Sequence, residues 1–192
     1  MRDDFVIKED ILEQITEETD FVVICNPNNP TGILTEKELI LRVLERAKET
    51  NTFVMADECF LEICQNESEY TVKPFIEKYE NLIILKSFTK LYAIPGVRLG
   101  FLFCGGQNRT EQIFNQLPEW NISIIAEAAG LAALDETEYC NKTIPYIGKE
   151  RAYLTAELEK LGIKVYPGEA DFLLIKTERQ LYNDLLKKNF SS

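Results

Sequence analysis

The chain has 192 residues, 45% of them hydrophobic and 28% charged, which is ordinary for a globular domain that can bury a core. The 32 acidic residues outnumber the 21 basic ones and give a net charge of -11, which argues against binding to nucleic acid. Histidine is absent, and this excludes Ser-His-Asp and Cys-His nucleophile systems, histidine metal ligands and histidine proton shuttles.

Signals for membranes, secretion and crosslinking are also missing from the sequence. No apolar run approaches the roughly 18 residues that a membrane helix needs. The charged residues 1–4 lack the apolar stretch of a secretory signal, so we expect a cytoplasmic protein with no membrane partner. Because no two cysteines have CxxC spacing, we expect neither a disulfide framework nor a metal site. The five cysteines are Cys25, Cys59, Cys64, Cys104 and Cys140.

In the first half of the chain, apolar runs alternate with amphipathic stretches, a pattern of β/α units on a largely parallel sheet. A short helix is predicted over 7–15. Strands are predicted over 21–25, 52–56, 82–85 and 99–104. The first of these strands, FVVIC, has the continuous apolar character of a strand buried on both faces. A turn is expected at 26–32, after which Thr35 opens a helix and Glu38 completes a capping box.

The second half of the chain is more helical. Helices are predicted over 122–134, 150–161 and 181–186, and a pair of strands over 163–165 and 172–175. A boundary between a larger and a smaller unit is expected near 141–151. We therefore expect 1–140 to be part of a large domain, and 141–192 to hold a connecting helix and part of a small domain.

Three polar clusters follow predicted strands, where open α/β sheets place their sites. The first is the turn NPNNPTG at 26–32, the second is Asp57 with Glu58, and the third is the run SFTK that ends at Lys90. Each has an ordinary structural explanation when it is taken alone. Prolines and asparagines suit a tight turn, an acid after a strand often caps a helix, and most lysines lie on the surface.

Taken together, the clusters resemble the motifs of fold type I enzymes that use pyridoxal phosphate (PLP). The run SFTK, with Arg98 eight residues beyond Lys90, resembles the family's cofactor-lysine motif. NPNNPTG resembles its ring-binding turn, and the segment DECF, which begins 28 residues after Asn29, resembles its pyridine-binding strand end. The resemblance covers nearly the whole chain. It implies an α/β fold with a mostly parallel sheet, flanking helices and part of a small α/β C-terminal domain.

The resemblance also implies a role for each of five residues, and the chemistry of PLP explains the residue types. Lys90 would form the Schiff base with the cofactor and act as the acid/base at Cα. Asp57 would keep the pyridine nitrogen protonated, and Asn29 would donate to the ring oxygen. Ser87 and Arg98 would hold the phosphate, Arg98 as a planar cation with several donors.

Within the family, the chain is similar to the branch of histidinol-phosphate aminotransferases and threonine-phosphate decarboxylases. The runs KSFTKLYAIPGVRLGFLF, PEWNIS and VYPGEADFLLIK look most like the decarboxylases. Many aminotransferases carry tyrosine three residues after the pyridine-binding aspartate, whereas this chain has Phe60. The resemblance implies a homodimer that decarboxylates a phosphorylated amino acid. The alternative reaction is transamination of the histidinol-phosphate type. Phe60 also has an alternative explanation, as a packing variant with no bearing on the reaction.

A Ser-x-x-Lys sequence is also found in penicillin-binding proteins and class A β-lactamases, where Ser87 would be the nucleophile. The chain has no Ser-Asp-Asn and no Lys-Thr-Gly sequence to complete such a site. That reading also leaves the clusters around Asn29 and Asp57 without a role, so the PLP interpretation is preferred.

Parts of the family pattern are missing from this sequence. The glycine-rich phosphate loop and the aromatic that stacks on the pyridine lie before the NPNNPTG turn in the family, and only 25 residues precede Asn26 here. Arg179 does not stand where the family has its substrate-carboxylate arginine. We therefore expect an internal piece of a longer enzyme that associates through the missing segments. The alternative from another class is a non-catalytic fragment or interaction module that keeps the fold.

Overall fold

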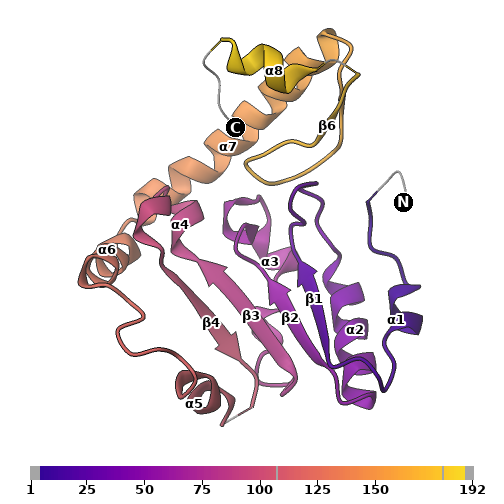
Figure 1. Ribbon diagram of the computed structural model, residues 1–192, viewed down its shortest axis with the longest axis vertical. Coiled ribbons are helices and arrows are strands. Elements are labelled where there is room, and N and C mark those ends of the chain that lie inside the picture. Colours follow the sequence, from indigo (N-terminus) through magenta and orange to yellow (C-terminus); the bar gives the residue numbers. More distant parts are fainter. Residues whose placement is uncertain (1–4, 107, 179, 189–192) are drawn as a thin grey trace.

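The computed structural model describes residues 5–106, 108–178 and 180–188. Its centre is a four-stranded sheet in the order β1-β2-β3-β4 (Figure 1). The strands are β1 (Phe21–Cys25), β2 (Phe53–Asp57), β3 (Leu82–Ser87) and β4 (Gly100–Cys104). β1, β2 and β3 run parallel, and β4 pairs with β3 in the antiparallel direction. The expected mostly parallel α/β sheet is confirmed, with each strand within two residues of its predicted bounds.

The main core lies where helix α2 (Lys37–Glu49) covers one face of the sheet. Its apolar stripe is fully buried against side chains from all three parallel strands. The buried cluster includes Ile24, Ile40, Val43, Leu44, Val54, Leu82 and Ile84. This face therefore follows directly from the 3.6-residue period of α2 meeting the apolar runs of the strands.

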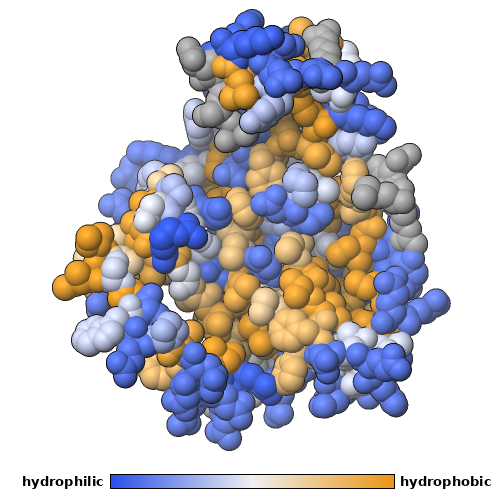
Figure 2. Space-filling model, viewed as in Figure 1, coloured by the Kyte–Doolittle hydropathy of each residue, from blue (hydrophilic) through white to orange (hydrophobic). Residues whose placement is uncertain are grey.

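β1 corrects one expectation, because it is not buried on both faces. It is an edge strand in this chain, and Val23 is 58% exposed. Figure 2 shows apolar side chains gathered over this face of the sheet. The apolar composition of FVVIC thus indicates a strand that is suited to burial, although nothing in the described part of the chain covers its second face.

The start of α2 corrects a second expectation. Glu36, and not Thr35, is the N-cap residue, and the cap has no side-chain hydrogen bond. The backbone N–H of Thr35 instead donates to Oδ1 of the buried Asn26 at 2.8 Å. The predicted capping box fails because the turn before the helix has already engaged Thr35. The first helix is also shorter than expected, since α1 spans only Ile11–Gln14.

Short elements connect the strands above the carboxyl ends of β2 and β3. They are η1 (Leu61–Ile63), α3 (Glu67–Tyr70), η2 (Lys73–Phe75), α4 (Phe88–Leu91) and η3 (Pro95–Val97). After β4 come α5 (Arg109–Phe114) and α6 (Ile124–Leu134). Among the described residues, no helix is long and apolar enough to cross a membrane.

Helix α7 (Thr137–Lys160) leads away from the sheet to the C-terminal part (Figure 1). That part holds the antiparallel pair β5 (Lys164–Val165) and β6 (Ile175–Lys176), followed by α8 (Leu181–Leu186). α7 begins 13 residues before the predicted helix, although Pro145 lies inside it. Tertiary packing explains the difference, because Cys140, Ile144 and Ile147 contact a second buried cluster that includes Leu61 and Leu91.

Candidate active site

The three polar clusters meet at one edge of the sheet, because β1, β2 and β3 are parallel and all end there. Backbone hydrogen bonds continue the pairing beyond the strands. The N–H of Asn26 donates to the carbonyl of Asp57 at 2.9 Å, and the N–H of Glu58 donates to that of Leu85 at 3.0 Å. The strand ends therefore hold the first residues of the turn and of the acidic pair side by side.

The NPNNPTG turn is fixed by its buried members and leaves Asn29 at the surface. The Asn26 side chain donates to the carbonyl of Thr35 at 3.2 Å as well as accepting from its N–H. Inside the turn, the Asn28 amide donates to Thr31 Oγ1 at 3.1 Å. The Asn29 side chain has no hydrogen bond to any other described residue, so its amide is available to a ligand.

The same turn packs against the loop between β5 and β6. Glu169 donates its N–H to the carbonyl of Gly32 at 2.7 Å. Gly32 has φ of +72°, and a Cβ added at Gly168 would lie 2.6 Å from the Thr31 carbonyl oxygen. Glycine is required at both positions, since one needs a left-handed backbone and the other a close backbone approach. Through this contact the C-terminal loop forms one wall beside the strand ends.

Asp57 ends β2 with its carboxylate held by backbone and thiol groups. Its Oδ1 accepts from the N–H of Cys59 at 3.0 Å, and the Cys25 sulfur lies 4.0 Å from Oδ2. Burial raises the pKa of the Cys59 thiol to about 12, with further contributions from its hydrogen bond to Asp57 and the charge of that carboxylate. The charge of Lys90 lowers the same pKa, so the pKa of Cys59 depends on both Asp57 and Lys90.

Lys90 projects from α4, the short helix directly after β3. Ser87 caps this helix, since its Oγ accepts the N–H of Thr89 at 3.3 Å and lies 2.8 Å from Thr89 Oγ1. The Lys90 amine lies 4.6 Å from the centroid of the Phe60 ring. No carboxylate among the described residues is within ion-pair distance of that amine. Lys90 is therefore an exposed amine over an aromatic ring.

Phe60 links Lys90 to the C-terminal loop. Its ring packs edge-to-face on Phe172, with centroids 5.2 Å apart. Arg151 of α7 anchors that loop by donating to the carbonyls of Glu169, at 2.7 Å, and Ala170, at 3.2 Å. The region around the Lys90 amine is consequently bordered by both parts of the chain.

Arg98 is the predicted residue that stands apart. It follows η3 in a left-handed conformation with φ of 58°, is exposed, and donates to the carbonyl of Pro95 at 2.9 Å. No hydrogen bond joins it to Ser87 in the described part of the chain. The structure thus brings Asp57 and Lys90 around Cys59, sets Ser87 at the base of α4 and Asn29 on the neighbouring turn, and leaves Arg98 bonded to its own loop. Arg179 lies outside the described residues.

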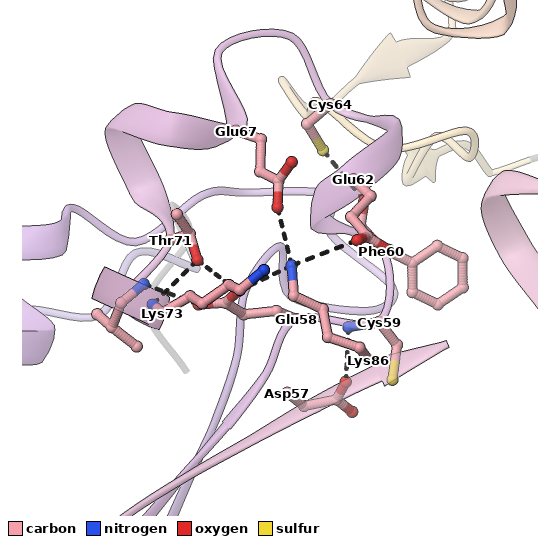
Figure 3. A network of polar contacts seen from close by, with 11 residues as sticks. Asp57, Glu58, Cys59, Phe60, Glu62, Cys64, Glu67, Thr71, Lys73 and Lys86 are labelled. Carbon is pink, nitrogen blue, oxygen red and sulfur yellow. Dashed lines mark hydrogen bonds and ion pairs between the residues drawn. The ribbon is translucent and has the colours of Figure 1, made fainter. Parts of the chain in front are cut away.

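Sequence reasoning missed a buried ionic network next to this edge (Figure 3). The Lys86 amine lies 3.1 Å from Glu58 Oε2 and 2.8 Å from Glu67 Oε1, and the side chains of Lys86 and Glu58 are 2% and 0% exposed. Glu58 also accepts from Thr71 Oγ1 at 2.7 Å and from the N–H of Val72 at 2.9 Å. The sequence signal for this network was Lys86 at the end of the apolar run LIILK, because a charge buried with such a run requires a partner.

Electrostatics within the network favour a charged lysine. Burial alone lowers the pKa of Lys86, but the charge of Glu58, the hydrogen bond and charge of Glu67, and the charge of Glu62 outweigh it, and the pKa is raised. Burial raises the pKa of Glu62, whose carboxylate is 3.9 Å from the Lys86 amine. Lys86 is therefore committed to carboxylates, which distinguishes it from the unpaired amine of Lys90.

The chain matches the family described as aminotransferase class I and II over residues 3–189, and it belongs to that family. The resemblance inferred from the three motifs is thereby confirmed, and so is PLP as the cofactor of the family. A histidinol-phosphate aminotransferase from Sinorhizobium meliloti, solved in complex with pyridoxal-5'-phosphate, shares the fold with a TM-score of 0.82 at 23% identity, over 97% of this chain and 52% of that one.

Among curated relatives, the chain is 32% identical over 179 residues to threonine-phosphate decarboxylase of Salmonella typhimurium, covering 93% of this chain and 49% of the relative. It is 36% identical over 175 residues to histidinol-phosphate aminotransferase of Ruminiclostridium cellulolyticum, covering 90% and 47%. The crystal structure of the Clostridium acetobutylicum histidinol-phosphate aminotransferase has a TM-score of 0.90 at 32% identity, covering 98% and 58%. The chain thus spans about half the length of the curated relatives it matches.

Proposed function

We propose that this chain carries the cofactor-binding edge of a PLP-dependent enzyme that acts on a phosphorylated amino acid, most like threonine-phosphate decarboxylase. The observation that carries the proposal is the unpaired Lys90 amine, held on the helix after β3 and close to the thiol that Asp57 bonds. The same proposal takes 1–140 as part of the PLP-binding domain and 141–192 as the connecting helix and part of the small domain.

The residues present fit PLP by their chemistry. The cofactor has an aldehyde, a pyridine nitrogen, a ring oxygen and a phosphate, and bound PLP supplies an electron sink. This chain offers a free amine at Lys90, a carboxylate at Asp57, a free amide at Asn29 and a hydroxyl at Ser87. Arg98 uses one N–H on Pro95 and keeps its other donors available for phosphate.

In this proposal each residue has a separate task. Lys90 holds the cofactor covalently and moves the proton at the substrate Cα. Asp57 holds the proton of the pyridine nitrogen, and its bond to the Cys59 N–H fixes the direction of the carboxylate. Asn29 donates to the ring oxygen, and Ser87 with Arg98 binds the phosphate.

Decarboxylation is the preferred reaction and transamination the alternative. Phe60 supports this order because its ring lies against the Lys90 amine and has no hydroxyl to donate to the cofactor. In a decarboxylase Lys90 would return a proton to Cα, whereas in an aminotransferase it would remove one. Release of carbon dioxide without a keto acid supports the first, and stoichiometric amino transfer to 2-oxoglutarate supports the second.

Covalent trapping tests the cofactor assignment. The chain is incubated with PLP, reduced with borohydride and digested, and we expect the label on the peptide that holds Lys90. A Lys90→Arg variant should lose the label, while a variant of a surface lysine paired with Glu45, Lys78→Arg, should keep it. A label on Lys86 or on many surface lysines contradicts the assignment.

A function of another class also has an observation in its favour. The chain spans about half of its relatives' length, and it exposes Trp120 at 94% and Ile124 at 81%. A non-catalytic module that keeps the fold and binds another polypeptide would carry such a surface. Failure of the wild-type chain to trap PLP, together with stable binding to a second polypeptide, supports this alternative.

Under the preferred proposal, the enzyme is cytoplasmic and binds neither nucleic acid nor membranes. It forms a homodimer, or its subunits associate through segments that its relatives have and this sequence does not show.

A further inference from the structure

We propose that Glu58 and Lys86 are positioning residues, whose buried ion pair sets the direction of the Asp57 carboxylate and the place of Ser87. This inference rests on the proposed function, because it concerns residues assigned to the cofactor. Neither Glu58 nor Lys86 needs to touch the cofactor, since both are closed off from solvent by the segment that follows β2.

Alternation along the strands links the pair to the site. Neighbouring residues in an extended strand point to opposite faces. Leu85 is the register partner of Asp57, so these two share one face, and Lys86 points to the other. Ser87 returns to the face of Asp57. Burying Glu58 and Lys86 on one side thus directs Asp57 and Ser87 to the opposite side.

The Glu58 carboxylate is held in place by three partners. Its two carboxylate oxygens bind the Thr71 hydroxyl, the Val72 N–H and the Lys86 amine, at 2.7, 2.9 and 3.1 Å. In Figure 3 the Asp57 carboxylate lies apart from these contacts and bonds the Cys59 N–H. Because Glu58 joins Asp57 to Cys59 in the chain, holding Glu58 fixes both ends of that hydrogen bond.

Lys86 carries the same constraint to β3. It lies one residue before the α4 cap and four residues before Lys90. A long amine held by Glu58 and Glu67 therefore ties the end of β2, helix α3 and the start of α4 into one unit. Loosening this tie should misplace the carboxylate and the helix cap together, and small displacements of such groups carry large losses of binding.

The experiment uses Lys86→Met, which removes the charge at similar length, and Lys86→Arg, which keeps it. Lys78→Met is the matched control, because Lys78 also pairs with a glutamate, Glu45 at 3.0 Å, but at the surface. Val43→Ala controls for general loss of stability, since Val43 lies on the buried face of α2 and is part of the main core.

The first readout needs no cofactor: amide hydrogen exchange at Cys59, compared with that at Val54 in β2, the strand that precedes Cys59. We expect Lys86→Met to speed exchange at Cys59 about tenfold or more beyond any acceleration at Val54, which reports the general loss of stability, and Lys86→Arg to restore most of the protection. Val43→Ala and Lys78→Met should leave the ratio of the two rates at its wild-type value.

The second readout is the pH midpoint of the yellow absorbance of the lysine-bound cofactor. We expect Lys86→Met to shift this midpoint and to weaken PLP binding about tenfold, while both controls keep the wild-type midpoint. Wild-type exchange at Cys59 in Lys86→Met, or an equal effect of Val43→Ala, overturns the positioning role. If the wild-type chain does not bind PLP, the proposed function fails, but the exchange measurement still decides whether the pair positions Asp57.

Discussion

At the ends of β2 and β3, charged residues that are close in sequence differ in burial. Asp57 faces the polar edge while Glu58 is fully buried, and Lys86 is buried while Lys90 is exposed. Each buried member finds an oppositely charged partner, as a charge removed from water requires. The members without such a partner, Asp57 and Lys90, are the two that the proposed function assigns to the cofactor. Burial, and not residue type, therefore separates the two kinds of charged residue.

A first prediction concerns the thiol between Asp57 and Lys90. The pKa of Cys59 is raised to about 12, mainly by burial and then by Asp57, so alkylation at neutral pH should be slow. Asp57→Asn removes the negative charge and should lower this pKa, which speeds alkylation of Cys59 at a given pH. Mass spectrometry of the alkylated peptides measures the rate.

Cys64 is the internal control for this measurement. Its pKa is also raised to about 12, mainly by burial, and Asp57 does not contribute. Asp57→Asn should therefore leave the alkylation rate of Cys64 unchanged. An equal acceleration at both thiols would mean that the variant unfolds the region, and no acceleration at Cys59 would contradict its coupling to Asp57.

A second prediction concerns the contact between the NPNNPTG turn and the C-terminal loop. A methyl group at Gly168 would lie 2.6 Å from the Thr31 carbonyl oxygen, which is backbone and cannot move aside. We expect Gly168→Ala to lower the free energy of unfolding by about 1–3 kcal/mol, the usual cost of overpacking. Gly96→Ala is the control, because nothing lies within 4 Å of its added Cβ. Equal urea midpoints for both variants would argue against this contact.

At the scale of elements, the turn after β1 determines where α2 begins. Asn26 is fully buried and satisfies both the N–H and the carbonyl of Thr35. A third prediction follows: Asn26→Ala should cost about 2–4 kcal/mol of unfolding free energy, because two buried backbone groups lose their partner. Asn28→Ala, which removes one partly buried bond to Thr31, should cost less. Urea denaturation ranks the two, and the reverse order would contradict the assignment.

The tie between β2 and β3 should make stability depend on alkaline pH. The folded-state pKa of Lys86 is raised above 10.5, because the charges of Glu58, Glu67 and Glu62 outweigh burial, which lowers it. Below pH 10.5 Lys86 keeps its proton in both the folded and the unfolded chain, so its full contribution to the free energy of unfolding is present. Above that value the unfolded chain loses its proton first, and the free energy of unfolding falls until folded Lys86 also titrates.

A fourth prediction compares wild type with Lys86→Met across this range. The variant should be less stable by about 3–5 kcal/mol at neutral pH, since it leaves a buried carboxylate without its partner. It should also lack the Lys86 component of the alkaline decline, so the two stability curves converge above 10.5. Parallel curves would mean that Lys86 does not bind its proton more tightly in the fold.

At the scale of the whole molecule, the described part of the chain exposes many large apolar side chains, and large exposed apolar patches mark interaction sites. They lie on β1 and β4, in the segment around α5 and α6, and on α7 and α8. Around α5 and α6, the most exposed are Trp120 at 94%, Ile124 at 81%, Ile125 at 72%, Phe114 at 70% and Leu131 at 64%. Covering this surface would remove apolar area from water, so it should drive association.

A fifth prediction tests that expectation by sedimentation velocity. The wild-type chain should form larger species as its concentration rises, and Ile124→Glu combined with Leu131→Glu should shift it toward the monomer. Leu161→Glu, at an exposed position after α7, is the control and should not. A wild-type chain that stays monomeric at every concentration would contradict the role of this surface.

Much of the site could be predicted because its residues sit next to strong local signals. Apolar runs mark β1, β2 and β3, and the polar residues after them fall at one edge once the strands are parallel. The position of the Arg98 side chain could not be predicted, since its left-handed backbone and its bond to Pro95 depend on how the loop folds. The Glu58–Lys86 pair was also missed, because a pairing across two strands leaves no periodic trace in the sequence.

The sequence by itself determined the α/β class, the strands, the family and the order of the motifs, because these depend on local periodicity and on short patterns. Only the tertiary structure decided that Thr35 does not cap α2, that α7 continues through Pro145, and that β1 is an edge strand. It also decided which lysine is buried. These outcomes share one physical reason: they depend on which groups, distant in sequence, compete for the same hydrogen bond, cavity or charge.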